Sequence, residues 1–442
     1  MHDTDTIAAL ATAPGEGGIA IVRVSGPEAE KLLQSLFVSR RDFDSHRLYY
    51  GHIVYQGETL DECMAVLMRA PRTYTREDVA EIHLHGGDWA AQSVLRALYA
   101  LGARAAEPGE FTRRAFMNGR IDLSRAEAVM NLISADSHRA ARAAVRQLSG
   151  GVSAFIRAAQ EELIALLSGA AAAIDYPEEI SFEEAAGNIG PRARALAEKL
   201  DAACDERGAR IAEQGIEAVL CGRPNVGKSS LLNALSRQER AIVTSIPGTT
   251  RDIIRADVMI DGLRVHFSDT AGLRESGDTI EQIGVDRARR AIAGADAVLT
   301  VFNAGEPMTE EDTALLRETA HSPRIIVLNQ CDRPMVLNPQ NFDHPVVVSA
   351  ATGKGIPELE KRVAAFGAGA GESALTQQRH MALARQAAAA LRAAADICEN
   401  GEDVSLAVID LQAALAVLGR VTGEQVDEKL IDDIFSRFCV GK

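Results

Sequence analysis

The sequence has few cysteines and no pair of them close together. Its six cysteines are scattered along 442 residues without a C-x-x-C pair, which argues against a disulfide scaffold and against a structural zinc site. The longest mostly apolar run, residues 163–174, is too short to span a bilayer. No lysine or arginine precedes Arg23, so the charged start of a signal peptide is lacking. These absences predict a cytoplasmic protein without a membrane segment.

An excess of basic side chains is lacking too. The chain carries 62 acidic residues against 47 lysines and arginines, for a net charge of -15. This balance excludes a protein whose whole surface binds nucleic acid, although a local basic patch remains compatible with it. Apolar residues at 47% and charged residues at 25% are typical of a soluble globular protein. At about 150 residues per domain, the length predicts two to four domains.

Residues 1–120 show the pattern of an α+β domain. Short β-patterned runs at 19–24, 64–68 and 79–84 lie among glycine-rich turns, and residues 89–101 have helical spacing. We therefore expect a sheet and a helix in this region.

The next region is rich in alanine, leucine and arginine. Ser124 and Glu127 have the spacing of a capping box, which predicts that a helix begins there. Few turn residues follow up to residue 212, so we expect long helices, and the same texture returns at residue 373. The glycines of 367–371 are typical of a flexible hinge. Residues 121–212 and 373–442 are therefore predicted to form one discontinuous all-α helical domain.

A segment of alternating character interrupts this helical domain. Between residues 215 and 366, apolar runs alternate with helical stretches, which predicts a parallel sheet covered by helices. The runs are residues 216–221, 263–268, 297–302, 324–328 and 345–349. The prediction is a multidomain α/β protein in which an inserted domain, its two ends close together, divides the helical domain.

The inserted segment carries a phosphate-binding motif. Gly222-Arg-Pro-Asn-Val-Gly-Lys-Ser229 matches G-x-x-x-x-G-K-[ST] and lies between a strand-like run and a helix-like run, as a P-loop requires. Its glycines let backbone amides surround phosphate oxygens, Lys228 reaches the terminal phosphates, and the Ser229 hydroxyl is a ligand for Mg²⁺. A glycine-rich turn without a ligand is the alternative interpretation of this motif taken alone.

Three further segments follow the P-loop in the order of a GTPase. Thr249-Thr250 offers a hydroxyl to Mg²⁺, and Asp269-Thr-Ala-Gly272 supplies a carboxylate near the metal and a glycine amide near the γ-phosphate. Later, Asn329-Gln-Cys-Asp332 supplies a carboxylate that accepts hydrogen bonds from the ring N–H and the amino group of guanine. Adenine does not present both donors together. The segment is therefore predicted to be a Ras-like P-loop GTPase domain that binds GTP.

Several positions depart from the usual GTPase motifs. Gln330 stands where lysine normally covers the base, which predicts weaker nucleotide affinity with the guanine preference kept. Ser349-Ala350-Ala351 replaces S-A-K, and the Ala350 amide remains available to the guanine oxygen. Leu273 stands where a Ras-like enzyme has the glutamine that orients water. Glu281 is the candidate for that role, with a solvated helix residue as the alternative.

The order of segments over essentially the whole chain resembles the tRNA-modification GTPase family called MnmE or TrmE. The landmarks are residues 15–26 with Arg23, 108–112, 118–123, 175–177 and the terminal Phe438-Cys-Val-Gly-Lys442. The resemblance implies a homodimer that forms a heterotetramer with a flavin-dependent partner, MnmG or GidA. Together they would modify carbon 5 of the wobble uridine of certain tRNAs with a carboxymethylaminomethyl or aminomethyl group. A tetrahydrofolate derivative, 5-formyl- or methylene-tetrahydrofolate, would supply the one-carbon unit.

The resemblance also implies roles in the GTPase domain. Glu281 would position the attacking water as a catalytic residue. The implied K⁺ ligands are Asn225, Thr244, Ile246 and Thr249, and the implied Mg²⁺ ligands are Ser229 and Thr250. The full nucleotide-binding set would be Asn225, Val226, Gly227, Lys228, Ser229, Ser230, Thr244, Ser245, Ile246, Pro247, Gly248, Thr249, Thr250, Asp269, Thr270, Ala271, Gly272, Asn329, Asp332, Ser349 and Ala350.

In the N-terminal domain, which would also dimerise, the resemblance implies a folate site. Arg23, Glu81, Arg120 and Lys442 fall at the positions of the folate-binding residues. Arg120 stands where the family has lysine, so its charge is kept while its geometry does not carry over automatically. Without the resemblance, Arg23 would be interpreted as a surface charge at a strand end.

Cys439 has two interpretations. A free cysteine is usually a small buried apolar residue, whereas the resemblance assigns Cys439 a catalytic role. An apolar stripe before it would hold a helix in the core and bring Cys439 and Lys442 to one place. The stripe consists of Val426, Leu430, Ile431, Ile434, Phe435 and Phe438.

A local excess of arginine lies between residues 112 and 146. Seven arginines and three acidic residues occur there, and Arg139, Arg142 and Arg146 have spacing that puts them on one helix face. This stripe is either a phosphate-binding surface for tRNA or a solvated helix face.

Three functions compete for the whole pattern. A GTPase within a tRNA-modifying complex accounts for every segment. A regulatory GTPase of ribosome assembly shares the GTPase motifs but leaves the 438–442 tail and the N-terminal domain without a role. A nucleotide-dependent scaffold would make Cys439 and Lys442 dispensable.

Overall fold

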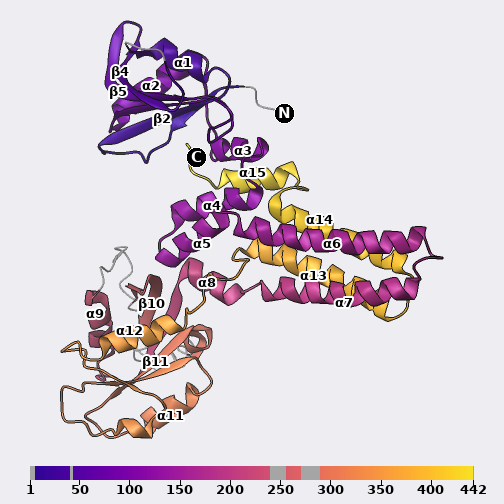
Figure 1. Ribbon diagram of the computed structural model, residues 1–442. Coiled ribbons are helices and arrows are strands. Elements are labelled where there is room, and N and C mark those ends of the chain that lie inside the picture. Colours follow the sequence, from indigo (N-terminus) through magenta and orange to yellow (C-terminus); the bar gives the residue numbers. More distant parts are fainter. Residues whose placement is uncertain (1–4, 40–42, 239–254, 270–288, 442) are drawn as a thin grey trace, which may run out of the picture. The chain divides into compact units, whose positions relative to one another are not determined.

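The computed structural model describes residues 5–39, 43–238, 255–269 and 289–441. The chain divides into two compact units. The first comprises Met1–Met130, Gln147–Leu196 and Ala389–Lys442, and the second comprises Asn131–Arg146 and Ala197–Ala388. An α+β part, a helical part and an α/β part are all present, which confirms the predicted multidomain α/β class (Figure 1). The finer domain boundaries given above stay a prediction.

The N-terminal part of the first unit contains a seven-stranded sheet with the order β3-β4-β5-β6-β2-β1-β7. Its strands are β1 (Ile7–Leu10), β2 (Ile19–Ser25), β3 (Phe37–Val38), β4 (Arg47–Tyr55), β5 (Glu58–Met68), β6 (Val79–His85) and β7 (Arg104–Ala105). Neighbouring strands are antiparallel except for the parallel pair of β1 and β7. The predicted strands at 19–24, 64–68 and 79–84 are confirmed as β2, β5 and β6.

Two helices, α1 (Ala29–Leu36) and α2 (Asp88–Ala100), pack on one face of this sheet. Because side chains alternate between the two faces along a strand, Val22 lies in the core with the helices. Its neighbour Arg23 projects from the opposite face, together with its cross-strand partner Glu81. The helix predicted at 89–101 is confirmed as α2.

Helices form the rest of the first unit. They are α3 (Glu110–Met117), α4 (Leu123–Ser134), α6 (Gly151–Asp175), α7 (Phe182–Ala202), α13 (Gln378–Glu399), α14 (Val404–Thr422) and α15 (Glu428–Ser436), of which α4, α7 and α13 continue into the second unit. Helices α6 and α14 are far apart in the sequence but pack along each other (Figure 1).

Among the helices that the structure describes, α14 is the one that could cross a membrane by its length and composition. Its mean hydropathy is 1.7, and a core helix of a soluble protein passes the same test. Leu411 and Leu418 of α14 are fully buried. The α14 helix is longer than the 163–174 run singled out in the sequence. Asp410 and Arg420 interrupt its apolar residues but do not end the helix.

The start of α4 differs from the prediction. The helix begins at Leu123, and the Asp122 side chain accepts a hydrogen bond from the Arg125 amide at 3.0 Å. The Ser124 hydroxyl instead donates to Asp122 at 2.7 Å. The predicted capping box at Ser124 is therefore wrong, because the carboxylate before it caps the helix and suits the positive end of the helix dipole.

The apolar stripe near the C-terminus lies in the core, as predicted. Ile431, Ile434, Phe435 and Phe438 form one buried cluster with Leu123, and the rest of the stripe packs against it. The α15 helix is thereby fixed to α4 and leaves a short extension after Ser436.

The second unit contains a six-stranded sheet with the order β13-β12-β11-β8-β10-β9. Its strands are β8 (Ile216–Cys221), β9 (Arg255–Ile260), β10 (Leu263–Asp269), β11 (Ala297–Asn303), β12 (Arg324–Asn329) and β13 (Val346–Val347). The helices in this unit include α5 (His138–Leu148, up to Arg146), α8 (Glu206–Gln214), α9 (Lys228–Gln238), α11 (Glu310–Glu318) and α12 (Ile356–Ala365).

This second sheet is mixed, so the predicted wholly parallel sheet is wrong at one edge. The five predicted runs are strands and pair in parallel, but β9 pairs antiparallel with β10. Asp261 and Gly262 join these two strands with φ values of 50° and 72°. Two residues with positive φ form the tight turn of a hairpin.

The arginines of α5 hold the glycine-rich segment. Arg139 donates a hydrogen bond to the Gly367 carbonyl, and Arg146 donates one to the Gly371 carbonyl. Ala370, between these glycines, is buried in the core. Arg139 and Arg146 therefore have hydrogen-bond partners within the fold, while Arg142 and Arg146 remain exposed. The two interpretations of the arginine stripe and the hinge at 367–371 stay predictions.

Candidate functional site

The P-loop follows β8 and leads directly into α9. A Cβ at Gly222 would lie 2.4 Å from the Val301 carbonyl oxygen, and one at Gly227 would lie 2.4 Å from the Asn329 side-chain nitrogen. Gly227 also has a φ of +91°, which side chains disfavour. Glycine at both positions therefore permits the tight backbone turn that a phosphate-binding loop needs.

Lys228 is the first residue of α9 and is buried. Its ammonium donates hydrogen bonds to the carbonyls of Gly222 and Arg223 at 2.8 and 2.9 Å. Asp269, also buried, ends β10, which runs parallel to β8 with Asp269 opposite Leu220. The carboxyl ends of parallel strands meet at one edge of a sheet, so Asp269 lies at the edge where the P-loop begins.

Asn329 joins the P-loop to the segment that follows β13. It ends β12 and is 1% exposed. Its side-chain amide donates to the Val226 carbonyl at 3.0 Å, and its side-chain oxygen accepts from the Ala350 amide at 3.2 Å. One side chain thus links the two segments that are predicted to contact the phosphates and the base.

Asp332 and Ser349 are joined by a hydrogen bond. The buried Ser349 hydroxyl donates to Oδ1 of the exposed Asp332 at 2.6 Å. This bond is the main cause that holds the pKa of Asp332 below its usual value. An ionised carboxylate only accepts hydrogen bonds, which suits the two donors on the edge of guanine.

Gln330 has a contact that the sequence did not predict. Its backbone has φ 65°, and its side-chain amide donates to the Asn225 carbonyl of the P-loop at 3.2 Å. Its side-chain oxygen is buried and has no hydrogen-bond partner among the described residues. Gln330 is therefore a second link to the P-loop beside Asn329.

Part of the predicted site lies outside the described residues. The residues concerned are Thr244, Ser245, Ile246, Pro247, Gly248, Thr249, Thr250, Thr270, Ala271, Gly272, Leu273, Glu281 and Lys442. Of the predicted metal ligands, Asn225 and Ser229 are described, and both are exposed. Ser230, in the first turn of α9, is exposed as well.

Arg23 and Glu81 form the centre of a second site, in the first unit. They are partners on β2 and β6, and Arg23 Nε lies 2.9 Å from Glu81 Oε1, with each side chain 17% exposed. His83 Nε2 lies 3.3 Å from the other oxygen of Glu81. Arg23 is therefore a largely buried partner in an ion pair, and the interpretation as a surface charge at a strand end is wrong.

Tyr74 lies against both arginines of this site. The Cζ atom of Arg120 is 4.7 Å from the centre of the Tyr74 ring, and that of Arg23 is 5.8 Å away. The Tyr74 hydroxyl is 3.0 Å from Thr112 Oγ1, and Arg23 Cζ lies 5.7 Å from the Phe111 ring. The 108–112 landmark thus supports this site through two of its side chains.

The C-terminal tail reaches the same site. The Arg23 guanidinium donates to the Gly441 carbonyl at 3.4 Å, and the Gly109 amide donates to the Cys439 carbonyl at 3.3 Å. Gly109 has a φ of +69°, and a Cβ there would lie 2.6 Å from the backbone of α15. The Cys439 thiol belongs to an exposed residue, which differs from the buried packing residue that a lone cysteine usually is.

A buried ion-pair network surrounds Glu110, the acidic residue of the 108–112 landmark. Glu110 lies 2.6 Å from Arg104 and 2.9 Å from Arg114, which also contacts Asp5 and Glu77 at 2.6 and 3.3 Å. Burial would raise the pKa of Glu110, but hydrogen bonds from Arg104, from a backbone amide and from Arg114 hold it below its usual value. The network ties β7 and α3 to Asp5 and Glu77, which lie just before β1 and β6.

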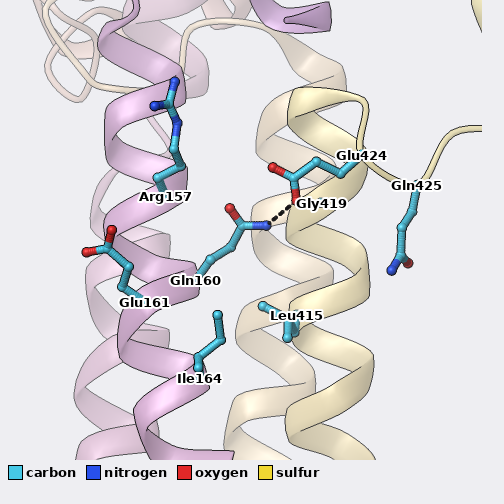
Figure 2. A pocket seen from close by; sticks show the side chains of 8 residues that line it. All are labelled: Arg157, Gln160, Glu161, Ile164, Leu415, Gly419, Glu424 and Gln425. Atoms are coloured by element: carbon cyan, nitrogen blue, oxygen red, sulfur yellow. Dashed lines mark hydrogen bonds between the residues drawn. The ribbon is translucent and has the colours of Figure 1, made fainter.

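A separate pocket of about 350 Å³ lies between α6 and α14 (Figure 2). Its lining residues are Arg157, Gln160, Glu161, Ile164, Leu415, Gly419, Glu424 and Gln425. Figure 2 shows Gln160 reaching toward Glu424, and the two side chains are hydrogen-bonded at 3.0 Å. None of the predicted site residues lines this pocket.

Residues of both units match models of known protein families. Residues 6–120 match the family model described as GTP-binding protein TrmE N-terminus, and residues 123–439 match the one described as MnmE helical domain. The chain belongs to the MnmE family of tRNA modification GTPases. Members of the MnmE family are GTP hydrolases that act in tRNA modification, so the predicted family and enzyme class are confirmed.

Full-length MnmE relatives support the same assignment. The tRNA modification GTPase MnmE of Chloroflexus aurantiacus is 48% identical over 453 residues, covering 99% of this chain and 100% of that protein. The one from Listeria welshimeri is 43% identical over 456 residues, with 99% of each chain covered. Among solved structures, the G domain of the T. maritima FeoB iron transporter is 27% identical, with a TM-score of 0.28, covering 34% of this chain and 98% of that one.

Proposed function

We propose that this chain hydrolyses GTP to drive modification of carbon 5 of the wobble uridine in certain tRNAs. The modification would be a carboxymethylaminomethyl or aminomethyl group, made with the flavin-dependent partner MnmG in a heterotetramer. The observation that carries the proposal is the meeting of Arg23, Glu81, Arg120 and the C-terminal tail at one site. A GTPase that only switched with its nucleotide would need no such second site.

The nucleotide would be held in the second unit. The P-loop backbone and Lys228 would hold the phosphates, and Asp332 with the Ala350 amide would hold guanine. The two enclosed glycines of the loop and the ionised state of Asp332 support this assignment. Ser229, with Thr250, would bind Mg²⁺, which neutralises charge on the phosphate oxygens during phosphoryl transfer.

We infer a K⁺ ion beside the phosphates. The backbone oxygen of Asn225 accepts from Gln330, so its side-chain oxygen is the one left for a cation. Oxygen atoms of Thr244, Ile246 and Thr249 would complete the set, and oxygen ligands suit hard cations. Glu281 would position the attacking water in place of the glutamine that Leu273 replaces.

A tetrahydrofolate derivative would bind in the first unit. Folates carry N–H donors on the pterin ring and carboxylates on the glutamate tail, so one carboxylate and two guanidiniums are complementary to them. Glu81 supplies the carboxylate, and Arg23 and Arg120 supply the guanidiniums. Lys442 would join them, because Gly441 already lies against Arg23.

The exposed Cys439 would act in the modification reaction, on the extension that α15 delivers to this site. The rival functions leave this arrangement unexplained. A ribosome-assembly GTPase needs neither the tail nor the Arg23 site, and a scaffold needs no exposed thiol there.

We infer that the chain dimerises through its N-terminal sheet and works on tRNA in the cytoplasm. The sheet face opposite α1 and α2 exposes Tyr50 at 65% and Leu48 at 45%, and exposed apolar patches mark interaction surfaces. Free cysteines in the described chain fit a reducing compartment.

Mass spectrometry of nucleosides from the wobble position tests the proposal. Cells that lack the chain should lose the carbon-5 modification on certain tRNAs, and a plasmid copy should restore it. Unchanged wobble nucleosides in the deletion strain would contradict the proposal.

A further inference from the structure

We propose that Tyr74 is a positioning residue: its ring orients the Arg120 guanidinium, which binds a carboxylate of the ligand. The ring also makes arginine better suited than lysine to bind the ligand from position 120. The inference rests on the proposed folate site and deepens it.

Tyr74 is itself fixed in place. Its hydroxyl is hydrogen-bonded to Thr112 at 3.0 Å, and its ring packs against a buried cluster that contains Phe111 and Ile7. The neighbouring Thr75 hydroxyl is 2.7 Å from the Ser25 hydroxyl on β2. The ring therefore has a defined position relative to the strand that carries Arg23.

The turn that carries Arg120 is tied to the same segment. The Asn118 side chain donates to the Thr75 carbonyl at 2.7 Å, and Arg76 donates to the Asn118 carbonyl at 2.9 Å. Gly119 reverses the chain with a φ of +67°, and the Arg120 amide then donates back into α3 at 2.9 Å. Arg120 Cζ consequently lies 4.7 Å from the centre of the Tyr74 ring.

The two arginines differ in the charge that they offer to a ligand. Arg23 is already paired with Glu81 at 2.9 Å. Arg120 is exposed, and no ion pair joins it to a carboxylate within the described ranges. Arg120 is therefore the one of the two guanidiniums whose charge no described protein carboxylate already balances, and the electron-rich face of Tyr74 holds it near Arg23 despite the like charge.

The ring also explains the choice of arginine. A guanidinium stacks on an aromatic face and still presents a planar fork of donors that binds a carboxylate with two hydrogen bonds. A lysine ammonium is a compact point charge on a flexible stem, so it offers no fork and is less well oriented by the ring. Tyr74 and Arg120 thus act as one unit.

Calorimetry with 5-formyl-tetrahydrofolate on the full chain tests this unit through a double-mutant cycle. Tyr74→Leu should weaken binding about 3- to 30-fold, the size of a cation–π contact, whereas Tyr74→Phe keeps the ring and should stay within about 2-fold of wild type. Arg120→Lys should weaken binding several-fold in the wild-type background, and by less when Tyr74→Leu is also present.

The outcomes distinguish a failure of the Tyr74 role from a failure of the folate site. Wild-type-like binding by Tyr74→Leu, or losses that simply add, would overturn the positioning role while leaving the folate site standing. No binding by the wild type would overturn both. GTP hydrolysis in the other unit and a cooperative thermal transition check that each variant folds. If Tyr74→Leu fails these checks, equal binding by Arg120→Lys and wild type still overturns the inference.

Discussion

The side chain of Gln330 donates a hydrogen bond to the backbone carbonyl of Asn225 at 3.2 Å, joining the Asn329–Asp332 segment to the P-loop. GTPases usually place a lysine at this position, and the glutamine keeps a donor there without its charge. We therefore expect nucleotide affinity to depend on this neutral link between the P-loop and the segment predicted to bind the base.

Substitution of Gln330 should lower nucleotide affinity when alanine replaces it and raise the affinity when lysine replaces it. Gln330→Ala removes the link to Asn225 and should speed GDP release about 5-fold, since a neutral hydrogen bond contributes about 1 kcal/mol. Gln330→Lys adds charge and a longer stem over the base and should slow release. Stopped-flow measurements with a fluorescent GDP follow both rates, and unchanged release in Gln330→Lys would show that glutamine is an adequate cover.

Asp332→Asn should move the nucleotide preference from GTP toward xanthosine triphosphate. The substitution replaces one of the two acceptor oxygens by a donor, which matches the extra carbonyl of xanthine. The Ser349 hydroxyl still has an acceptor in this variant, so the local fold is kept. Competition binding with the two nucleotides measures the change, and unaltered GTP preference would mean that guanine is recognised elsewhere.

Hydrolysis should be much faster in K⁺ than in Na⁺. A monovalent cation held by Asn225 and the 244–249 loop would neutralise charge on the β–γ oxygens, where other GTPases use an arginine. Asn225→Ala should remove the cation dependence, and Glu281→Ala should lower turnover while nucleotide still binds. Phosphate release in matched K⁺ and Na⁺ buffers decides this, and equal wild-type rates would contradict the role of the cation.

The buried network at Glu110 predicts an acid-sensitive N-terminal part. Because the folded pKa of Glu110 lies below the ordinary 4.5, its charge stabilises the fold above that pH, and this contribution is lost as the pH falls through the folded pKa. Glu110→Gln should cost about 3 kcal/mol at pH 7 and flatten the dependence on pH below about 4.5. Urea unfolding of wild type and Glu110→Gln at pH 7 and at pH 4 measures both effects. If the stability of the two proteins fell equally with pH, the network would be excluded as the cause of the acid sensitivity.

The sequence predicted the elements whose signals are local. The P-loop, the strand ends at Asp269 and Asn329 and the apolar stripe of α15 all follow from motif spacing or periodicity, and all are present. The antiparallel β9 was missed although Asp261-Gly262 is a typical hairpin signal, because the strand itself mixes Arg255 and Asp257 with apolar residues.

Contacts between distant segments could not be predicted in this way. Tyr74 lies in a stretch without periodicity, and its role depends on Thr112 and Arg120, which are far along the chain. Arg139 and Arg146 resemble a basic surface in sequence, and their hydrogen bonds to backbone carbonyls in 367–371 could not be predicted from the spacing. Asp122 takes the place of Ser124 as the helix cap because its carboxylate, two residues earlier, precedes the first helical residue Leu123.

We propose that the nucleotide site and the Arg23 site serve one modification reaction. Mass spectrometry of wobble nucleosides tests this in cells that lack the chain and receive one of three variants, Lys228→Ala, Arg120→Gln or Cys439→Ser. All three should fail to restore the carbon-5 modification, while purified Arg120→Gln and Cys439→Ser keep GTP hydrolysis near wild type and Lys228→Ala loses it. Full modification in cells that carry Cys439→Ser or Arg120→Gln would contradict the account.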